Sequence, residues 1–141
     1  MSKKVFSFTD RLGRQFAMRS PLEISIAKKI DQRQDLRWNF EALQIPVALD
    51  LQAKVGARYL VPDFQLYFPC GEKWVVEGKG VTLLDDYLKR KNTVVREYCE
   101  ANGFNYEIVL SMPTAETVDE WDRLVNIKGY ACVRDWFPRT V

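Results

Sequence analysis

The chain has 141 residues, with 21 Lys or Arg against 19 Asp or Glu, a net charge of +2, and no histidine. The absence of histidine excludes Ser-His-Asp and Cys-His catalysis, histidine-ligated zinc and a histidine general base. The three cysteines, Cys70, Cys99 and Cys132, are odd in number and widely spaced, which indicates neither a disulfide framework nor a zinc motif. A hydrolase with this composition must use carboxylates and lysine.

The length and the composition, 47% hydrophobic and 28% charged, predict one globular domain, 1–141, that is large enough to bury a core. The first ten residues lack the apolar core of a signal peptide, and no apolar run approaches the roughly 18 residues of a membrane span. We therefore expect a cytoplasmic protein without a membrane segment.

Turn and capping residues divide the chain into predicted strands and helices. Strands are expected at 5–8, 14–19, 36–45 and 46–51, as a pair between 61 and 80, and at 104–111. Helices are expected at 20–32, 82–103 and 117–126. Ser20 is the expected N-cap of the first helix, whereas Thr82 and Gly103 are expected to begin and end the second. This order predicts an α/β fold, with a mixed central sheet flanked by helices.

The stretch 61–80, VPDFQLYFPCGEKWVVEGKG, contains Asp63, Glu77 and Lys79 in two strands that are otherwise mainly apolar. Strand interiors disfavour Asp and Lys, so these residues need an explanation. If 69–71 forms a three-residue hairpin loop with Gly last, Asp63 lies opposite Glu77, with Lys79 farther along the same face. The same register gathers the apolar partners on the other face: Phe64, Leu66, Trp74 and Val76.

The opposed carboxylates indicate a catalytic site. Opposed side chains have Cβ atoms roughly 4.5 to 5.5 Å apart, so Asp63 and Glu77 would repel each other unless a positive charge lies between them. Lys79 can supply that charge, and so can Mg²⁺, which needs only one or two carboxylates when phosphate and water complete its octahedron. Lys79 would then orient the attacking water or accept its proton. A structural ion-pair cluster is the alternative, although burying charge is costly.

Basic residues are concentrated in two regions. Residues 1–40 carry nine Lys or Arg against four acids, a surplus of +5, and a second cluster lies at 89–91. These clusters are either solvated faces or phosphate contacts. Arg19 is a candidate DNA contact in the first region. In the second, only Lys89 or Arg90 is expected to meet phosphate, because 89–91 span nearly a helical turn and cannot all point the same way.

The sequence VPD followed by EGK resembles the PD-(D/E)XK signature of restriction-type nucleases. The stretches MRSPLE, WNFEALQIPV, YLVPDFQLYF and WVVEGKG are similar, in order and spacing, to the phage endonuclease I family of DNA junction-resolving enzymes, over roughly residues 18–110. They are also similar to the nuclease subunit of heteromeric transposases. The resemblance implies a restriction-endonuclease-like fold, a metal-dependent DNA endonuclease and an origin in a phage or mobile element.

By this resemblance, Asp63 and Glu77 are ligands of Mg²⁺, for which Mn²⁺ can substitute, and Lys79 is the catalytic lysine of the motif. The carbonyl of Gly78 would be a further metal ligand. Glu23 would assist in placing the metal or the water, although its position in a Ser-x-x-Glu capping box also gives it a structural role. The chain departs from the family pattern after residue 110, and nothing is carried over there.

The resemblance also implies a homodimer that acts on branched DNA. The segment 39–60 would then exchange strands between protomers, or else form an ordinary intrachain hairpin. Within the nuclease class, a transposase-associated or an intron-homing endonuclease remains an alternative. Outside that class, the alternative is a DNA-binding module that kept the fold without the chemistry.

Overall fold

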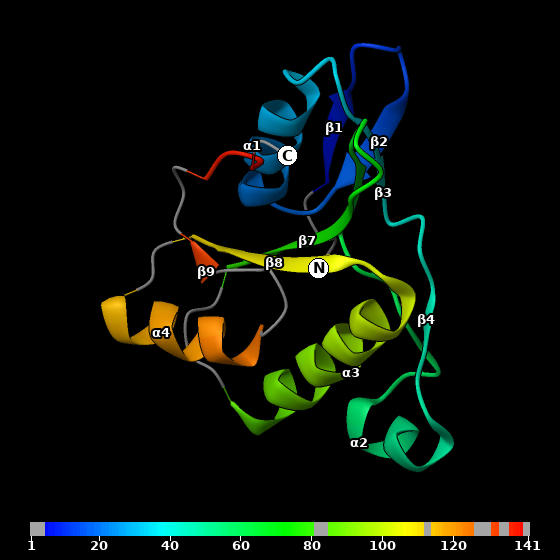
Figure 1. Ribbon diagram of the computed structural model, residues 1–141, viewed down its shortest axis with the longest axis vertical. Helices are drawn as coiled ribbons and strands as arrows, with labels where there is room; N and C mark the ends of the chain where they lie inside the picture. Colours follow the sequence, from blue (N-terminus) through cyan, green and yellow to red (C-terminus); the bar gives the residue numbers. More distant parts are fainter. Residues whose placement is uncertain (1–4, 81–84, 112–113, 126–130, 133–135, 140–141) are drawn as a thin grey trace.

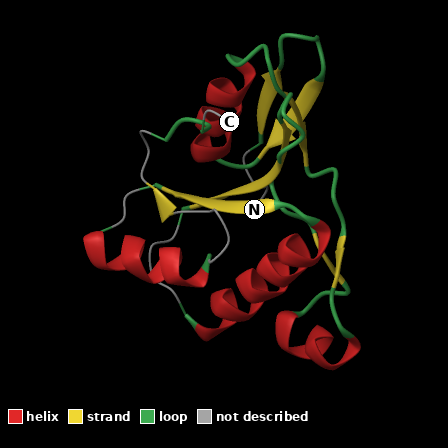
Figure 2. Ribbon diagram, viewed as in Figure 1, coloured by secondary structure: helices red, strands yellow, loops and turns green. Residues whose placement is uncertain are grey.

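The computed structural model describes residues 5–80, 85–111, 114–125, 131–132 and 136–139, and within these it contains helices on both sides of a mixed sheet (Figures 1 and 2). In chain order the elements are β1 (Phe6–Thr9), β2 (Gln15–Met18), α1 (Pro21–Asp31), β3 (Arg37–Phe40), β4 (Ile45–Pro46), a 3₁₀ helix (Leu49–Leu51), α2 (Gln52–Val55), β5 (Tyr59–Leu60), β6 (Phe64–Tyr67), β7 (Lys73–Lys79), α3 (Asp86–Asn102), β8 (Asn105–Leu110), α4 (Ala115–Leu124) and β9 (Ala131–Cys132). The predicted α/β class and mixed sheet are confirmed.

The central sheet has the strand order β3-β6-β7-β8-β9. Strand β6 runs antiparallel to both β3 and β7, whereas β8 runs parallel to both β7 and β9. Helix α1 and the β1–β2 hairpin cover one face of the sheet, and α3 and α4 cover the other (Figure 1). Among the described residues, no helix is both long and apolar enough to cross a lipid bilayer.

The β6–β7 hairpin has the predicted register. Phe64 pairs with Val76 and Leu66 with Trp74, and Gly71 closes the loop with a φ of 96°. A positive φ favours glycine because it has no side chain to clash with the backbone. Alternation then divides the two strands between two cores: Phe64, Leu66, Trp74 and Val76 pack toward α1, whereas Val75 and Tyr67 pack toward α3.

Helix α1 begins as predicted and lies very close to β7. The hydroxyl of Ser20 accepts a hydrogen bond from the Glu23 N–H at 3.1 Å. A Cβ atom placed on Gly78 would lie only 2.9 Å from the Ile26 side chain and 3.2 Å from that of Leu22. Glycine at 78 is therefore what lets the first turn of α1 approach the end of β7, and with it Glu23.

The prediction of a strand at 46–51 is wrong over most of that segment. Only Ile45 and Pro46 form a strand, and a 3₁₀ helix and α2 follow. The apolar residues of this segment suggest a buried strand, but Leu49 is 84% exposed, so its side chain is not part of a buried strand face. The preceding strand ends at Phe40, not at 45, because Glu41 takes a left-handed φ of 52°.

In the single chain, segment 39–60 pairs with itself, and Ile45 lies opposite Leu60. Helix α3 ends at Gly103 as predicted. Thr82, its predicted cap, lies outside the described residues, and the described helix is capped by Asp85, whose carboxylate accepts from the Leu88 N–H at 2.8 Å.

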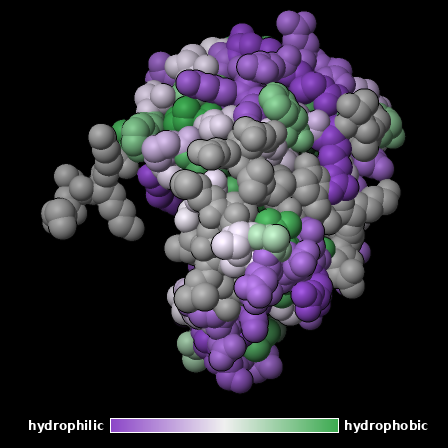
Figure 3. All heavy atoms as spheres, turned by 90° about the vertical axis from the view of Figure 1, so that its left-hand side faces the viewer, coloured by the Kyte–Doolittle hydropathy of each residue, from purple (hydrophilic) through white to green (hydrophobic). Residues whose placement is uncertain are grey.

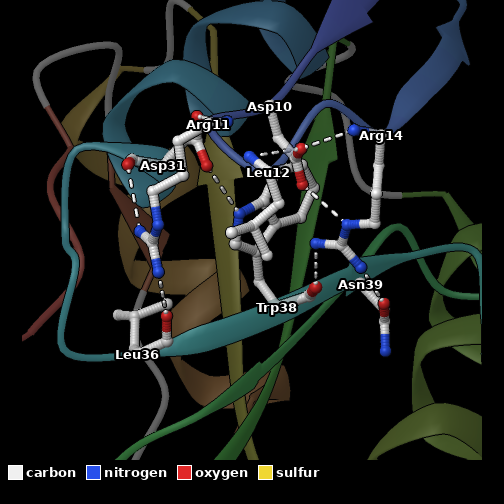
Figure 4. Close-up of polar contacts among 8 residues, drawn as sticks. All are labelled: Asp10, Arg11, Leu12, Arg14, Asp31, Leu36, Trp38 and Asn39. Carbon is white, nitrogen blue, oxygen red and sulfur yellow. Dashed lines mark hydrogen bonds and ion pairs between the residues drawn. The ribbon is translucent and has the colours of Figure 1, made fainter.

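Two arginines from the β1–β2 turn cover the free edge of β3 (Figure 4). Arg14 donates to the Trp38 carbonyl at 2.8 Å and to Oδ1 of Asn39 at 2.7 Å. Arg11 donates to the Leu36 carbonyl at 3.1 Å. Because Trp38 lies in an edge strand and Leu36 directly precedes it, the guanidinium groups satisfy these carbonyls and block the pairing of another strand. Part of the N-terminal positive charge is therefore structural.

The C-terminal residues 136–139 pack against the sheet on the side of α1. The Trp136 indole donates to a carboxylate oxygen of buried Glu107, and Nε of Arg139 lies 3.6 Å from the other oxygen of that group. Trp38, Trp74, Trp121 and Trp136 are all buried, as expected for core residues. On the face viewed in Figure 3, hydrophobic residues form small separate groups among hydrophilic ones.

Candidate active site

The β6–β7 hairpin brings the two predicted carboxylates together. Asp63 immediately precedes the first residue pair of the ladder, and Glu77 immediately follows it on β7. Oδ2 of Asp63 accepts a hydrogen bond from the Gly78 N–H at 2.9 Å. Nζ of Lys79 lies 3.8 Å from Oε2 of Glu77. Asp63, Glu77 and Lys79 therefore form one group at the end of β7, as the sequence predicts.

These three side chains open into a pocket of about 190 Å³ on the α3 side of the sheet. Strand and helix residues both contribute to its wall, including Asp63, Glu77, Lys79, Lys91, Asn92 and Val95. Two lysines and two carboxylates thus share one small cavity. Such a cavity can hold a phosphate group next to a cation, because it supplies charges of both signs.

Burial and the negative charge of Glu77 raise the pKa of Asp63 to about 7, and the charge of Glu23 adds to the effect. The Gly78 N–H and the positive charge of Lys79 oppose the increase without cancelling it. Two neighbouring carboxylates in a partly desolvated site therefore hold a proton until a stronger cation neutralises them.

Tyr106 and Asn92 fix the position of Glu77 from behind. Tyr106 on β8 is fully buried, and its hydroxyl hydrogen-bonds to Oε2 of Glu77 and also contacts Oδ1 of Asn92 at 2.7 Å. Asn92 in turn donates to the Leu88 carbonyl of α3 at 2.8 Å. Burial and the charge of Glu77 raise the pKa of Tyr106 well above its ordinary value, so the hydroxyl keeps its proton. This chain ties Glu77 to both β8 and α3.

Glu23 is buried near the pair but is engaged elsewhere. Its carboxylate accepts from the Arg19 N–H at 2.9 Å. Its charge still contributes to the raised pKa of Asp63. In the part of the chain that the structure describes, no three Asp, Glu, Cys or His side chains come close enough to form a metal-ligating group. The structure therefore assembles Asp63 and Glu77 as a pair, with Glu23 beside them.

The basic candidates occupy different positions. Arg19 is exposed, and its guanidinium lies 3.3 Å from the carboxylate of Glu41. Lys89 is exposed on α3, whereas Arg90 turns away and contacts the Lys54 carbonyl of α2 at 3.5 Å. Lys91, which was not predicted as a phosphate contact, is the member of the 89–91 cluster that lines the pocket.

The sequence did not predict four residues around the acid pair: Lys91, Asn92, Tyr106 and Glu41. Tyr106 carries no local signal, because its contact with Glu77 depends on the parallel register of β7 and β8. Helical spacing alone does not say which of residues 89–91 faces the sheet. Glu41 is recognised only from the structure. Its backbone has a φ of 52°, and its N–H donates a hydrogen bond to the Asp63 carbonyl at 2.8 Å. Strained backbone of this kind often occurs at functional sites.

A larger pocket, of about 400 Å³, lies at the other end of β6, next to Tyr67. Arg11 and Arg14 line it, but these are the side chains that cover the edge of β3, and Asp10 and Asp31 lie among them. The pocket therefore belongs to the structural arginine network and not to the acid pair.

No protein family, no curated protein and no solved structure matches this chain. Any function of this chain must therefore be inferred from the residues of the site itself.

In the absence of metal, stability is expected to fall as the pH rises from about 4 to about 7. The pKa of Asp63 is 3.8 in the unfolded chain and about 7 in the folded one, so the folded state binds the extra proton across this interval. The stabilising contribution is complete below the lower value and is lost as the pH passes the higher one. Urea unfolding in EDTA at a series of pH values measures it.

The matched comparison is Asp63→Asn, whose stability should change less over the same interval because the titrating group is gone. Above pH 7, Mg²⁺ should stabilise the original protein more than the variant, because a ligand of the folded state shifts unfolding by mass action. Parallel pH profiles for the two proteins would contradict the assignment.

Proposed function

We propose that this protein is a Mg²⁺-dependent DNA endonuclease of the PD-(D/E)XK type, with a restriction-endonuclease-like fold. The observation that carries the proposal is the grouping of Asp63, Glu77 and Lys79 in one pocket on neighbouring strands. The spacing of these residues in the sequence and their grouping in space support the same chemistry, phosphodiester hydrolysis.

The donor set of the pocket fits Mg²⁺. Asp63 and Glu77 supply hard carboxylate oxygens, and Mg²⁺ needs only one or two of these when phosphate and water fill its other positions. The raised pKa of Asp63 indicates that the pair lacks positive charge, although Lys79 is near. When bound, the ion would act as a Lewis acid on the phosphate and stabilise the charge of the transition state.

The side chains of this site have different roles in the reaction. Lys79, whose Nζ lies 3.8 Å from Oε2 of Glu77, orients the attacking water, which loses its proton to solvent. The water oxygen forms a bond to phosphorus as the bond to the leaving sugar oxygen breaks. Lys91, on the opposite wall, pairs with a phosphate oxygen. Tyr106 and Asn92 keep Glu77 in place during these steps.

We further propose that the enzyme is a homodimer that acts on branched DNA. One set of Asp63, Glu77 and Lys79 cuts one strand, whereas resolving a junction takes two cuts. A two-fold dimer supplies two sites related in the same way as the two strands to be cut. Arg19, exposed on the α1 side, and Lys89, exposed on α3, would extend the contact with the phosphate backbone.

Cleavage of a four-way junction and of a linear duplex, each in Mg²⁺, Mn²⁺, Ca²⁺ and EDTA, tests the proposal. We expect cutting in Mg²⁺ and Mn²⁺, poor turnover in Ca²⁺ because it is the weaker Lewis acid, and none in EDTA. The junction should be cut faster and bound more tightly than the duplex at matched salt.

Each other outcome has a distinct meaning. Full activity in EDTA would overturn the metal mechanism. DNA binding without cleavage in any ion would favour the inactive DNA-binding module. Cleavage of duplex only at particular sequences would favour a transposase-associated or homing endonuclease. A monomer by light scattering, with equal affinity for both DNAs, would eliminate junction resolution but leave the nuclease proposal intact.

A further inference from the structure

An exposed tyrosine lies next to a lysine that lines the acid pocket. Tyr87 is in the first turn of α3 and is 43% exposed, although a tyrosine ring gains free energy from burial. It belongs to neither of the two core clusters. Nζ of Lys91 lies 5.1 Å from the centre of its ring. Since Lys91 also lines the pocket, one lysine joins the tyrosine ring to the site of Asp63 and Glu77.

The pocket wall itself has an exposed apolar side chain. Val61 follows β5, lines the same pocket and is 42% exposed. The pocket wall therefore contains two lysines, Lys79 and Lys91, and the exposed Val61, and Tyr87 adjoins it through Lys91. Proteins that bind single-stranded nucleic acid use this combination, in which cationic groups meet the phosphates and aromatic rings stack on the bases.

The spacing on α3 matches this division of roles. Tyr87 and Lys91 are four residues apart, so they are neighbours on one helix surface, with Cβ atoms about 5 to 6 Å apart. A phosphate paired with Lys91 would have the base of an adjoining nucleotide within reach of the Tyr87 ring. A base that is paired within a duplex is already stacked on both faces, so only an unpaired base is free to make this contact.

We propose that Tyr87 stacks on the unpaired nucleobase next to the scissile phosphate, and that this contact makes the enzyme prefer DNA with an unpaired nucleotide at the cut. The inference rests on the proposed nuclease function and adds the feature of the substrate that the site selects. Lys91 lines the pocket and lies over the Tyr87 ring, so it would keep a bound phosphate next to that ring.

The experiment places the fluorescent base 2-aminopurine, unpaired, at each position around the cleavage site, and measures its quenching on binding in Ca²⁺. Stacking on Tyr87 quenches the fluorescence, so Tyr87→Ala should lose the quenching and Tyr87→Phe should keep it. Tyr87→Ala should also cut DNA with an unpaired nucleotide about 10- to 100-fold more slowly, because stacking on one base contributes roughly 1–3 kcal/mol. Its rate on fully paired duplex should stay the same.

Phe137 provides the matched control. It is 60% exposed and also carries a lysine over its ring, with Nζ of Lys29 at 4.9 Å from the centre, but it lies on the side of α1. Phe137→Ala should therefore leave both readings unchanged. Equal quenching by Tyr87→Ala and the original protein would overturn the inference, and so would an equal loss of rate on paired and unpaired DNA.

The outcomes separate the inference from the function on which it rests. If the original protein cuts DNA and Tyr87→Ala behaves like it, only the stacking inference fails. If the original protein binds without cutting, the nuclease proposal fails and the quenching series still decides whether Tyr87 stacks. If it binds no DNA, both proposals are overturned. If a protein partner proves to cover Tyr87, only the stacking inference fails.

Discussion

Asp63→Asn and Glu77→Gln are each expected to reduce DNA cleavage by about 1,000-fold or more, while DNA affinity stays equal or improves. Each change removes one of the two carboxylates that would hold the metal, and several kcal/mol of transition-state stabilisation are lost with it, at 1.36 kcal/mol per tenfold in rate. Removing a negative charge also reduces the repulsion of phosphate. Cleavage rates in Mg²⁺ and binding in Ca²⁺ separate the two effects.

Glu100→Gln is the matched control for these two variants. Glu100 is 49% exposed on α3, and its partner is Arg96 at 3.7 Å, so the same chemical change should leave cleavage unaffected. Circular dichroism checks the fold of every variant. Loss of the fold in Asp63→Asn or Glu77→Gln would favour a structural ion cluster over a catalytic site, and normal cleavage by either folded variant would contradict the proposed mechanism.

Tyr106→Phe is expected to raise the Mg²⁺ concentration needed for half-maximal cleavage by about 10- to 100-fold. The hydroxyl is fully buried and contacts both Glu77 and Asn92. Groups that orient a metal-binding residue from behind typically affect metal affinity or activity to this extent. The variant should also lose about 1–3 kcal/mol of unfolding free energy, because two buried polar groups lose their partner. A Mg²⁺ titration of the cleavage rate measures the first effect.

Tyr98→Phe separates the loss of a hydroxyl from the loss of this network. The Tyr98 ring also packs against the α3-side core, next to Phe104, and its hydroxyl has no hydrogen bond to the described residues. Its Mg²⁺ requirement should match that of the original protein. If Tyr106→Phe lowered stability alone and left the Mg²⁺ requirement unchanged, Tyr106 would have only a structural role.

The hairpin that carries the acid pair could be predicted because its signals are local. Gly71 fixes the loop, and two-residue alternation fixes which side chains share a face, so the register that sets Asp63 opposite Glu77 follows from adjacent sequence. The start of α1 could be predicted for the same reason, because the Ser20 hydroxyl accepts a hydrogen bond from a residue only three positions away. A slip of one residue in the hairpin would bury charge among the apolar partners.

Other elements could not be predicted because competing local signals were similar in strength. Both Thr and Asp are good N-caps, and in the described helix it is Asp85 that caps α3. The run around Leu49 has the composition of a strand, yet Leu49 is exposed and the chain turns into short helices there. The composition of a segment indicates how much free energy the burial of its side chains would contribute. The tertiary structure decides which of these side chains are buried.

The sequence alone determined the mixed α/β class, the acid and lysine group at the end of the hairpin, and the exclusion of histidine chemistry. The tertiary structure alone decided what surrounds that group. Tyr106 reaches Glu77 only because β8 lies parallel to β7, and Asn92 reaches Tyr106 only because α3 packs against these strands. Lys91 lines the pocket because of the orientation of α3. These contacts join residues 14 to 29 positions apart. The local sequence does not predict such long-range contacts, because the free energy that favours closing the loops between them comes from the packed core as a whole.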